Sequence, residues 1–250
     1  MQLHYQSIGD GQPLILLHGL FGSSDNWGTI AKHFSQTHQV IYVDLRNHGK
    51  SPHHHSQSYA EMASDLLELC DALHLDTIHL LGHSLGGKVA MQFATQYPDR
   101  TNKLIVVDMA MRSYTDEHTH LMDAMMSVDF DSMQTRSDVD KALSHPISNM
   151  MIRQFLLMNL VKTDNGLRWR INLPALKANY LNMIQSVQAQ YHQPSLFIYG
   201  ERSDYISNSD ISHIETHFTQ AKFTSLPTGH WVHAEAPAAF IKAVSAFLID

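Results

Sequence analysis

The sequence predicts an α/β fold with a mostly parallel central sheet and helices on both of its faces. Short apolar runs rich in β-branched residues recur along the chain, as is typical of strands buried on both faces. Helical patterns separate the middle runs, which favours parallel strands covered on both sides. The alternation stops near Ala110 and resumes near Pro194, which indicates an insertion into the sheet-forming part of the chain.

The strands and helices expected from this alternation follow one another in order. Leu3 to Ile8 precedes the turn Gly9 to Gly11 and is expected to form an antiparallel hairpin at the sheet edge. The expected buried strands are Pro13 to Leu17, Val40 to Val43, Ile78 to Leu81, Leu104 to Val107, Leu196 to Tyr199 and Lys222 to Leu226. The expected core helices are Tyr59 to Leu73, Lys88 to Tyr97 (ended by Pro98) and an alanine-rich helix after Trp231.

The inserted segment shows helical patterns and no convincing strand. Its expected helices are Thr119 to Met126, Ser137 to Leu143, Asn149 to Leu160 and Leu173 to Gln188. Ten of the 13 methionines lie between Met109 and Met183, and flexible apolar methionine suits a surface that adapts to an apolar ligand. Ordinary helix packing accounts for most of them. We therefore expect a core of residues 1–110 and 189–250 and a helical cap of residues 111–188 over the sheet.

Composition excludes several classes of protein. The 250 residues fit one large domain with an insertion, and 44% of them are hydrophobic, enough for a buried core. With a net charge of −7 and no basic run, nucleic acid is not an expected partner. No apolar run is long enough to span a membrane, and the N-terminus lacks the charged region of a signal peptide. The lone cysteine, Cys70, excludes an internal disulfide and falls on the apolar stripe of an expected helix. We expect a cytoplasmic protein.

Histidine is unusually frequent, with 19 residues, yet the sequence does not favour a metal site. The run His53 to His55 lies in a polar stretch without a carboxylate or cysteine at ligand spacing, so we interpret it as a solvated loop. Neither an H-E-x-x-H nor a C-x-x-C motif is present. We expect neither a metal nor another cofactor.

A nucleophile motif follows the third buried run. Gly82 to Gly86 reads G-x-S-x-G, directly after an apolar strand and before a helix, which is the strand–turn–helix setting of a nucleophile elbow. Ser84 would lie at the tip of a strained turn, where Cβ atoms at the flanking glycines would collide with the neighbouring strand and helix. The alternative, a dinucleotide-binding turn, lacks the required G-x-G-x-x-G order.

A serine hydroxyl needs a base, and the base needs an acid that orients it. In this strand–turn–helix setting the chain order is nucleophile, acid, histidine, so the base is expected near the C-terminus. His230 follows the last expected strand and is favoured over His233.

An anion-stabilising loop is expected after the first buried strand. His18 to Gly22 closes that strand, and such loops donate one backbone N–H to an oxyanion hole, the other coming from the residue after the nucleophile. We assign the backbones of Leu20 and Leu85 to these roles. His18 itself is expected to be a hydrogen-bonded scaffold residue rather than a catalyst.

These motifs together resemble the α/β-hydrolase superfamily, and the resemblance spans the whole chain. GHSLGG at Gly82 to Gly87 is a common form of its elbow, and Gly229 to Pro237 is similar to its terminal histidine motif. Asp44 to Ser51 looks like its D-x-R-G-H-G-x-S loop, with Asn47 where glycine is usual. The set most resembles the small bacterial acyl-CoA esterases of YbfF type. This implies cofactor-free esterase and acyl-CoA thioesterase activity. We also expect Phe21 and Trp231 to contact the substrate.

The resemblance leaves two candidates for the acid. Superfamily members usually carry it three residues after the glycine that ends the penultimate strand, here Gly200, but that position holds Ser203 and Asp204 comes one residue late. The YbfF-type subgroup, which this chain resembles, has another arrangement. Its acid follows the earlier strand, where Asp108 stands in this chain, and a supporting serine lies in the later loop. We favour Asp108, because it directly follows a buried strand.

The predicted function is hydrolysis of a carboxylic ester or acyl-CoA thioester through an acyl-enzyme on Ser84. An alternative is perhydrolase (haloperoxidase-type) or carbon–carbon bond hydrolase chemistry on the same scaffold, since both also use serine. A non-catalytic binding protein with this fold is a further alternative, which the intact motifs disfavour. The expected partner is a small acyl ester or acyl-CoA, and the expected assembly is a monomer or small homo-oligomer.

Overall fold

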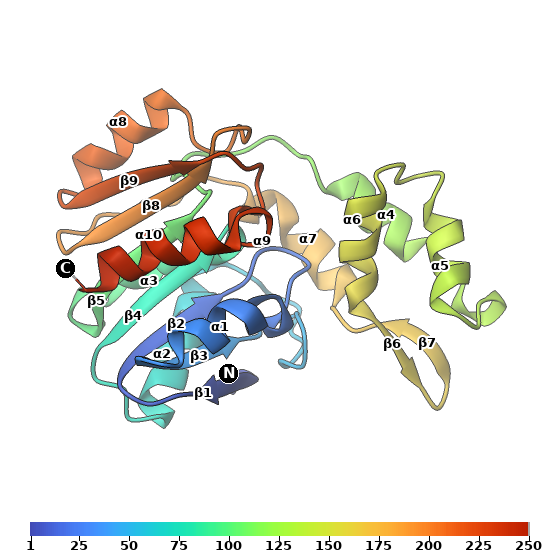
Figure 1. Ribbon diagram of the computed structural model, residues 1–250. Coiled ribbons are helices and arrows are strands. Elements are labelled where there is room, and N and C mark those ends of the chain that lie inside the picture. Colours follow the sequence, from blue (N-terminus) through green and yellow to red (C-terminus); the bar gives the residue numbers. More distant parts are fainter. Residues whose placement is uncertain (250) are drawn as a thin grey trace.

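A seven-stranded sheet forms the centre of the molecule in the computed structural model, which describes residues 1–249. Its order is β1-β3-β2-β4-β5-β8-β9 (Figure 1), and every neighbouring pair except β1–β3 is parallel. The strands are β1 (Tyr5–Ile8), β2 (Gln12–Leu17), β3 (His38–Val43), β4 (Ile78–His83), β5 (Thr101–Val107), β8 (Ser195–Gly200) and β9 (Ala221–Leu226). The predicted fold class is confirmed, and each of the six apolar runs lies within one of these strands.

The first strand corrects the expected hairpin. β1 is antiparallel and at the sheet edge as expected, but it pairs with β3 (Ile8 opposite Val40) and not with β2. Both edges of β2 are already occupied by β3 and β4. The turn at Gly9 to Gly11 therefore carries the chain from the free edge of β3 into the interior of the sheet.

Helices cover both faces of the sheet because strand side chains alternate between two apolar clusters. Ile15 and Leu17 belong to the cluster on the side of α2 (Tyr59–Ala72), α3 (Leu85–Gln96) and α8 (Asn208–His217). Leu14 and Leu16 belong to the cluster on the side of α1 (Gly28–Phe34) and α10 (Pro237–Ile249).

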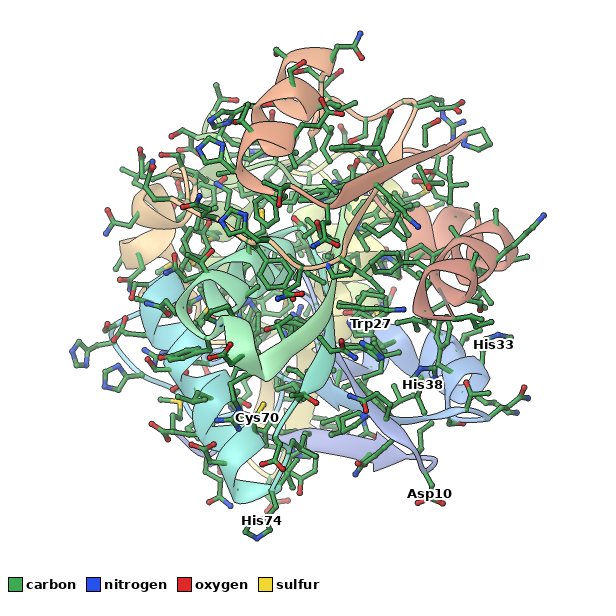
Figure 2. The ribbon with its side chains drawn as sticks, turned by 90° about the vertical axis from the view of Figure 1, so that its left-hand side faces the viewer. Asp10, Trp27, His33, His38, Cys70 and His74 are labelled. Carbon is green, nitrogen blue, oxygen red and sulfur yellow. The ribbon has the colours of Figure 1, made fainter. Side chains whose placement is uncertain are left out.

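Cys70 and Trp27 illustrate the two clusters. Cys70 on α2 is fully buried in the first, as predicted for a core residue, and burial raises the pKa of its thiol to about 12. Trp27, before α1, is fully buried in the second. Figure 2 shows them on opposite sides of the strands.

The segment between β5 and β8 lies to one side of the sheet (Figure 1). It contains α4 (Thr119–Met126), α5 (Arg136–Leu143), α6 (Met150–Leu156) and α7 (Leu173–Met183). The expected helix to Leu160 ends earlier, with one 3-10 turn over Leu157–Asn159, and the expected helix to Gln188 ends at Met183. After Met183 the chain runs back beside the start of the segment, where the Val187 N–H donates to the Met111 carbonyl at 2.8 Å.

A hairpin in this segment corrects the expectation that it holds no strand. β6 (Leu160–Thr163) pairs antiparallel with β7 (Gly166–Trp169) around Asp164 and Asn165. Gly166 has φ of +101°, which suits a residue without Cβ. Strands of four residues show too little alternation to stand out from helical patterns, so the Asn-Gly pair is the one local signal.

No helix within residues 1–249 combines the length and apolar character needed to cross a bilayer.

Candidate active site

Ser84 lies in a strained turn between β4 and α3. Its backbone has φ of 54° and ψ of −118°, a left-handed conformation that non-glycine residues rarely adopt. The turn needs both of its glycines, because a Cβ on Gly82 would lie 2.1 Å from the Gly86 carbonyl oxygen and one on Gly86 would lie 2.6 Å from the Leu17 carbonyl oxygen. The Ser84 N–H donates to the Val107 carbonyl at 3.0 Å. The neighbouring strand β5 therefore holds the strained residue in place.

Asp108 is the carboxylate that meets His230. Its Oδ2 accepts a hydrogen bond from His230 Nδ1 at 2.7 Å and one from the Ser203 hydroxyl at 2.5 Å, while Oδ1 accepts the Gly200 N–H at 3.0 Å. The Asp108 side chain is fully buried. Because an ionised carboxylate only accepts, the hydrogen of the neutral imidazole lies on Nδ1 and Nε2 is left as a proton acceptor.

Asp204 takes no part in this contact. It is exposed, and its carbonyl oxygen accepts a hydrogen bond from the Arg112 guanidinium at 2.8 Å. Ser203 takes the usual position of the acid and binds the Asp108 carboxylate instead. The structure thus brings Asp108 and Ser203 to His230.

Two further residues fix His230, and neither was identified from the sequence. The Tyr205 ring stacks on the His230 ring at 3.8 Å between centroids and 20° between planes. His83 Nε2 donates to the His230 carbonyl at 2.9 Å, and burial holds the pKa of His83 well below its usual value, so this ring is neutral. Tyr205 lies two residues after Ser203 in the loop that follows β8, and no spacing in the sequence indicates that its ring meets that of His230.

The loop after β2 is organised by His18. The Leu45 N–H donates to His18 Nε2 at 3.0 Å, so the ring hydrogen lies on Nδ1, which donates to the Gly19 carbonyl at 2.8 Å. Burial lowers the pKa of His18, which keeps the ring neutral. Both ring nitrogens are thereby occupied, as expected for a scaffold residue.

The same loop approaches the elbow closely. A Cβ on Gly19 would lie 3.2 Å from Ser84 Cβ, and Phe21 has φ of 62° within the tight turn. Leu20, Phe21 and Leu85 all line one cavity with Ser84.

The departure at Asn47 has a structural reason. Asn47 has φ of 65°, the region that favours glycine but that asparagine tolerates better than other residues. Its side-chain oxygen accepts hydrogen bonds from the His54 N–H at 2.8 Å and from Asn172 Nδ2 at 3.0 Å. Asn172 caps α7. Asparagine therefore keeps the turn and adds a link to the inserted segment, which glycine lacks.

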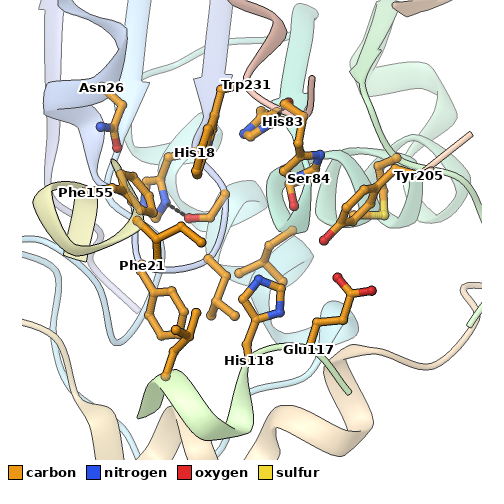
Figure 3. Close-up of a pocket in the computed structure, with 18 of the residues that line it drawn as sticks. His18, Phe21, Asn26, His83, Ser84, Glu117, His118, Phe155, Tyr205 and Trp231 are labelled. Atoms are coloured by element: carbon orange, nitrogen blue, oxygen red, sulfur yellow. Dashed lines mark hydrogen bonds between the residues drawn. The ribbon is translucent and has the colours of Figure 1, made fainter. Parts of the chain in front are cut away.

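A cavity of about 460 Å³ lies between the strand ends and the inserted segment. Ser84 and His230 line it, together with Phe21 and Trp231, the two residues expected at the substrate. Residues of the inserted segment complete the wall (Figure 3). They are Tyr114, Thr115, Glu117, His118, Leu121, Met151, Ile152, Phe155, Leu156, Met158, Tyr180, Met183 and Ile184.

The histidine run lies in a loop away from this cavity. His53 and His55 are exposed, and His53 Nε2 forms a hydrogen bond with the Arg170 carbonyl at 3.0 Å. Within residues 1–249 no group of three histidine, cysteine or acidic side chains is arranged to hold a metal ion.

Comparison with known proteins defines the class of this chain. The family model for the alpha/beta hydrolase fold matches residues 12–237, and the chain belongs to this family. The predicted resemblance to YbfF-type esterases is also confirmed. The chain is 35% identical to esterase YbfF of Escherichia coli K12, over 98% of this chain and 96% of that protein.

Two further relatives agree with this class. The sn-1-specific diacylglycerol lipase ABHD11 of Danio rerio is 39% identical, over 98% of this chain and 80% of that protein. A solved structure described as a marine microorganism esterase is 38% identical, with a TM-score of 0.96, over 98% of this chain and 99% of that one. The chain is thus an α/β hydrolase of the esterase and lipase type.

Proposed function

We propose that the protein hydrolyses carboxylic esters through an acyl-enzyme on Ser84, with His230 as base and Asp108 as acid. The observation that carries the proposal is the 2.7 Å hydrogen bond between His230 Nδ1 and the buried Asp108 carboxylate, beside a serine in a strained elbow. This bond leaves Nε2 free to take the serine proton and stabilises the imidazolium that results.

The chemistry runs in two halves. Ser84 Oγ attacks the ester carbonyl while His230 Nε2 takes its proton, and the same proton then leaves with the alcohol. A water molecule then attacks the acyl-enzyme in the same way, with His230 again as the base, and the carboxylic acid product is released with Ser84 restored. The backbone N–H groups of Leu20 and Leu85 stabilise the negative carbonyl oxygen at both stages, since each belongs to a turn held rigidly beside Ser84.

We also propose that residues 111–188 form a cap that selects the acyl group, over a core of residues 1–110 and 189–250. Two hydrogen bonds join the ends of this segment, from the Val187 N–H to the Met111 carbonyl and from the Tyr114 N–H to the Ile184 carbonyl, both at 2.8 Å. The segment supplies much of the cavity wall opposite Ser84. Hydrolysis of acyl-CoA thioesters requires the same serine chemistry, so both esters and acyl-CoA thioesters should be assayed as substrates.

Replacement of Ser84 tests the proposal. Ser84→Ala is expected to lower kcat by at least about 10³-fold on nitrophenyl esters of graded chain length and on acyl-CoA, because the triad works as a unit. A fluorophosphonate is expected to label the wild type and not the variant. Near-normal turnover by Ser84→Ala would falsify the assignment.

A further inference from the structure

The cavity has two unlike sides, with Ser84 between them. One side is largely aromatic: the Phe155 and Trp231 rings lie 5.8 Å apart, and Phe21 adjoins them (Figure 3). His18 and Asn26 lie on the same side, but their polar side-chain atoms form hydrogen bonds within the protein. The other side carries polar groups, namely Tyr114, Glu117, His118, Tyr180 and Tyr205. A hydrocarbon acyl chain gains most by burial against the apolar side. The polar side is therefore left for the alcohol part of the ester.

His118 lies where the two sides meet. It precedes α4, its ring centroid is 6.0 Å from that of Phe21, and Figure 3 shows it across the cavity from Ser84. Burial, together with the nearby His230, lowers the pKa of His118 to about 4. The ring is therefore neutral at physiological pH and carries a hydrogen on one nitrogen only.

Tyr180 determines which nitrogen carries that hydrogen. The Tyr180 hydroxyl lies 2.9 Å from His118 Nδ1 and accepts the Glu117 N–H at 3.4 Å. Tyr180 is 3% exposed, so a hydroxyl hydrogen without an acceptor would be costly there. All three groups are satisfied when the hydroxyl donates to Nδ1. The hydrogen of His118 then lies on Nε2.

The Nε2–H group opens onto the cavity. Within residues 1–249, Nδ1 is the side-chain atom of His118 that forms a hydrogen bond, and Nε2 is not among the buried polar atoms that lack a partner. The residue lines the cavity, so Nε2–H faces the space that substrate occupies. The ester carbonyl oxygen already has the N–H groups of Leu20 and Leu85 in the proposed mechanism. The Nε2–H group of His118 is therefore available to a second acceptor atom on the substrate.

We propose that His118 is a specificity-determining residue that donates Nε2–H to an oxygen on the alcohol part of the substrate. Preferred substrates are then esters of alcohols that carry a second oxygen, rather than esters of simple alkanols. A plain alkyl group leaves the donor without a partner when it displaces water, which is how sites built around a hydrogen bond reject analogues that lack the polar group. The inference rests on the proposed function of Ser84.

A matched pair of substrates tests this. 2-Hydroxyethyl butyrate and propyl butyrate have the same acyl chain and differ by a hydroxyl in place of a methyl group. The wild type is expected to favour the hydroxyethyl ester in kcat/KM by about tenfold or more. His118→Phe keeps a ring and removes the donor, so it is expected to bring the kcat/KM values of the two esters within about twofold of each other, through a loss on the hydroxyethyl ester and a gain on the propyl ester, which no longer leaves a donor unpaired.

Two variants separate the donor from general disturbance of the cap. Tyr180→Phe frees the His118 tautomer and is expected to reduce the preference for the hydroxyethyl ester in part. His120→Phe, at an exposed position two residues along the chain, is expected to leave the preference unchanged.

The outcomes are distinct. Equal kcat/KM of the wild type on the two esters, or an equal loss on both in His118→Phe, overturns the role of His118 and leaves the serine mechanism standing. Absence of hydrolysis of both esters, together with absence of fluorophosphonate labelling at Ser84, overturns the proposed function and this inference with it.

Discussion

The strand edge below the cavity and the inserted segment above it are held in place by different means. At the strand edge, main-chain hydrogen bonds fix the residues of the site. Ser84 and Asp108 both have positive φ, and the N–H of each donates to the carbonyl of a residue on a neighbouring strand. The inserted segment is held largely by side chains. Lys88, Asn47 and Asn159 reach from one part to the other.

This difference indicates which substitutions should affect turnover and which should affect substrate preference. The strained backbone of Ser84 and Asp108 persists only because the surrounding sheet determines it, so the chemical groups are fixed together with the fold. The segment above is joined to the core by hydrogen bonds from individual side chains, and substitutions of these side chains can alter the cavity while the sheet stays intact. We expect changes at the strand edge to affect turnover and changes at the contacts of the segment to affect substrate preference.

The largest effect is expected at Asp108. Asp108→Asn keeps the shape but removes the charge that fixes the His230 tautomer, so kcat is expected to fall by about 10² to 10⁴-fold. Asp204→Asn is the matched control and is expected to cost less than about tenfold, since Asp204 is exposed. Steady-state kinetics on one nitrophenyl ester measures both variants. The reverse ranking would refute the assignment, and similar losses would mean that both carboxylates serve.

A smaller and selective effect is expected at Lys88, which joins α3 to both ends of the inserted segment. This buried lysine donates to the Arg112 carbonyl at 2.9 Å and to the Gln185 carbonyl at 2.5 Å. Burial, with a contribution from the Arg112 charge, lowers the pKa of Lys88 to about 7. Lys88→Met removes both hydrogen bonds. We expect KM for long-chain esters to rise about tenfold and kcat for acetate esters to change less than about threefold.

Lys103 offers a matched control for this variant. It also donates to two carbonyls, those of Phe247 and Leu248, both at 2.9 Å, but these lie at the end of α10 within the core. Lys103→Met is expected to lower thermal stability without altering chain-length preference. Equal scaling of long and short substrates in Lys88→Met would show that its contacts are only structural.

The smallest effect concerns stability rather than activity. Burial, with a smaller contribution from nearby histidines, lowers the pKa of both His48 and His233 from 6.5 to about 3. Below pH 6.5 the unfolded chain binds protons that these folded-state rings do not, so the free energy of unfolding falls as pH falls from about 6.5 towards 3. Each such histidine contributes a slope of up to about 1.4 kcal/mol per pH unit.

Urea unfolding between pH 7 and pH 5 measures this slope. The carboxyl of Glu61, whose pKa is lowered from 4.5 to about 2, affects the free energy of unfolding only at lower pH. His48→Phe is expected to reduce this slope by up to about 1.4 kcal/mol per pH unit, which corresponds to one proton fewer taken up on unfolding. A free energy of unfolding that is constant over this range would contradict the prediction.

The sequence predicts best what depends on local pattern. The six apolar runs are recognisable because strands buried on both faces need continuous apolar side chains. The elbow is recognisable because its glycines keep a fixed spacing around Ser84, although the contact that requires Gly86 is with the Leu17 carbonyl on another strand. The place of Asp108 directly after a buried strand predicts a carboxylate held at the sheet edge, and the structure has it there in contact with His230. The motif at Gly229 likewise indicates His230.

What the sequence does not show depends on contacts between distant segments. The pairing of β1 with β3 follows from which sheet edge is free, and the hairpin β6–β7 is too short to show a period. Tyr205 and His118 gain their places only when the loop after β8 and the start of α4 meet above His230 and Ser84. No spacing in the sequence marks such meetings.

The most direct test of the account is the site of acylation during turnover. A nitrophenyl ester is mixed with the enzyme, quenched within the first turnover, and the protein is digested for mass spectrometry. We predict a burst of nitrophenol and an added acyl mass on the peptide that contains Ser84, with neither in Ser84→Ala. Turnover that proceeds with the acyl mass on another residue, or an undiminished burst in Ser84→Ala, would contradict it.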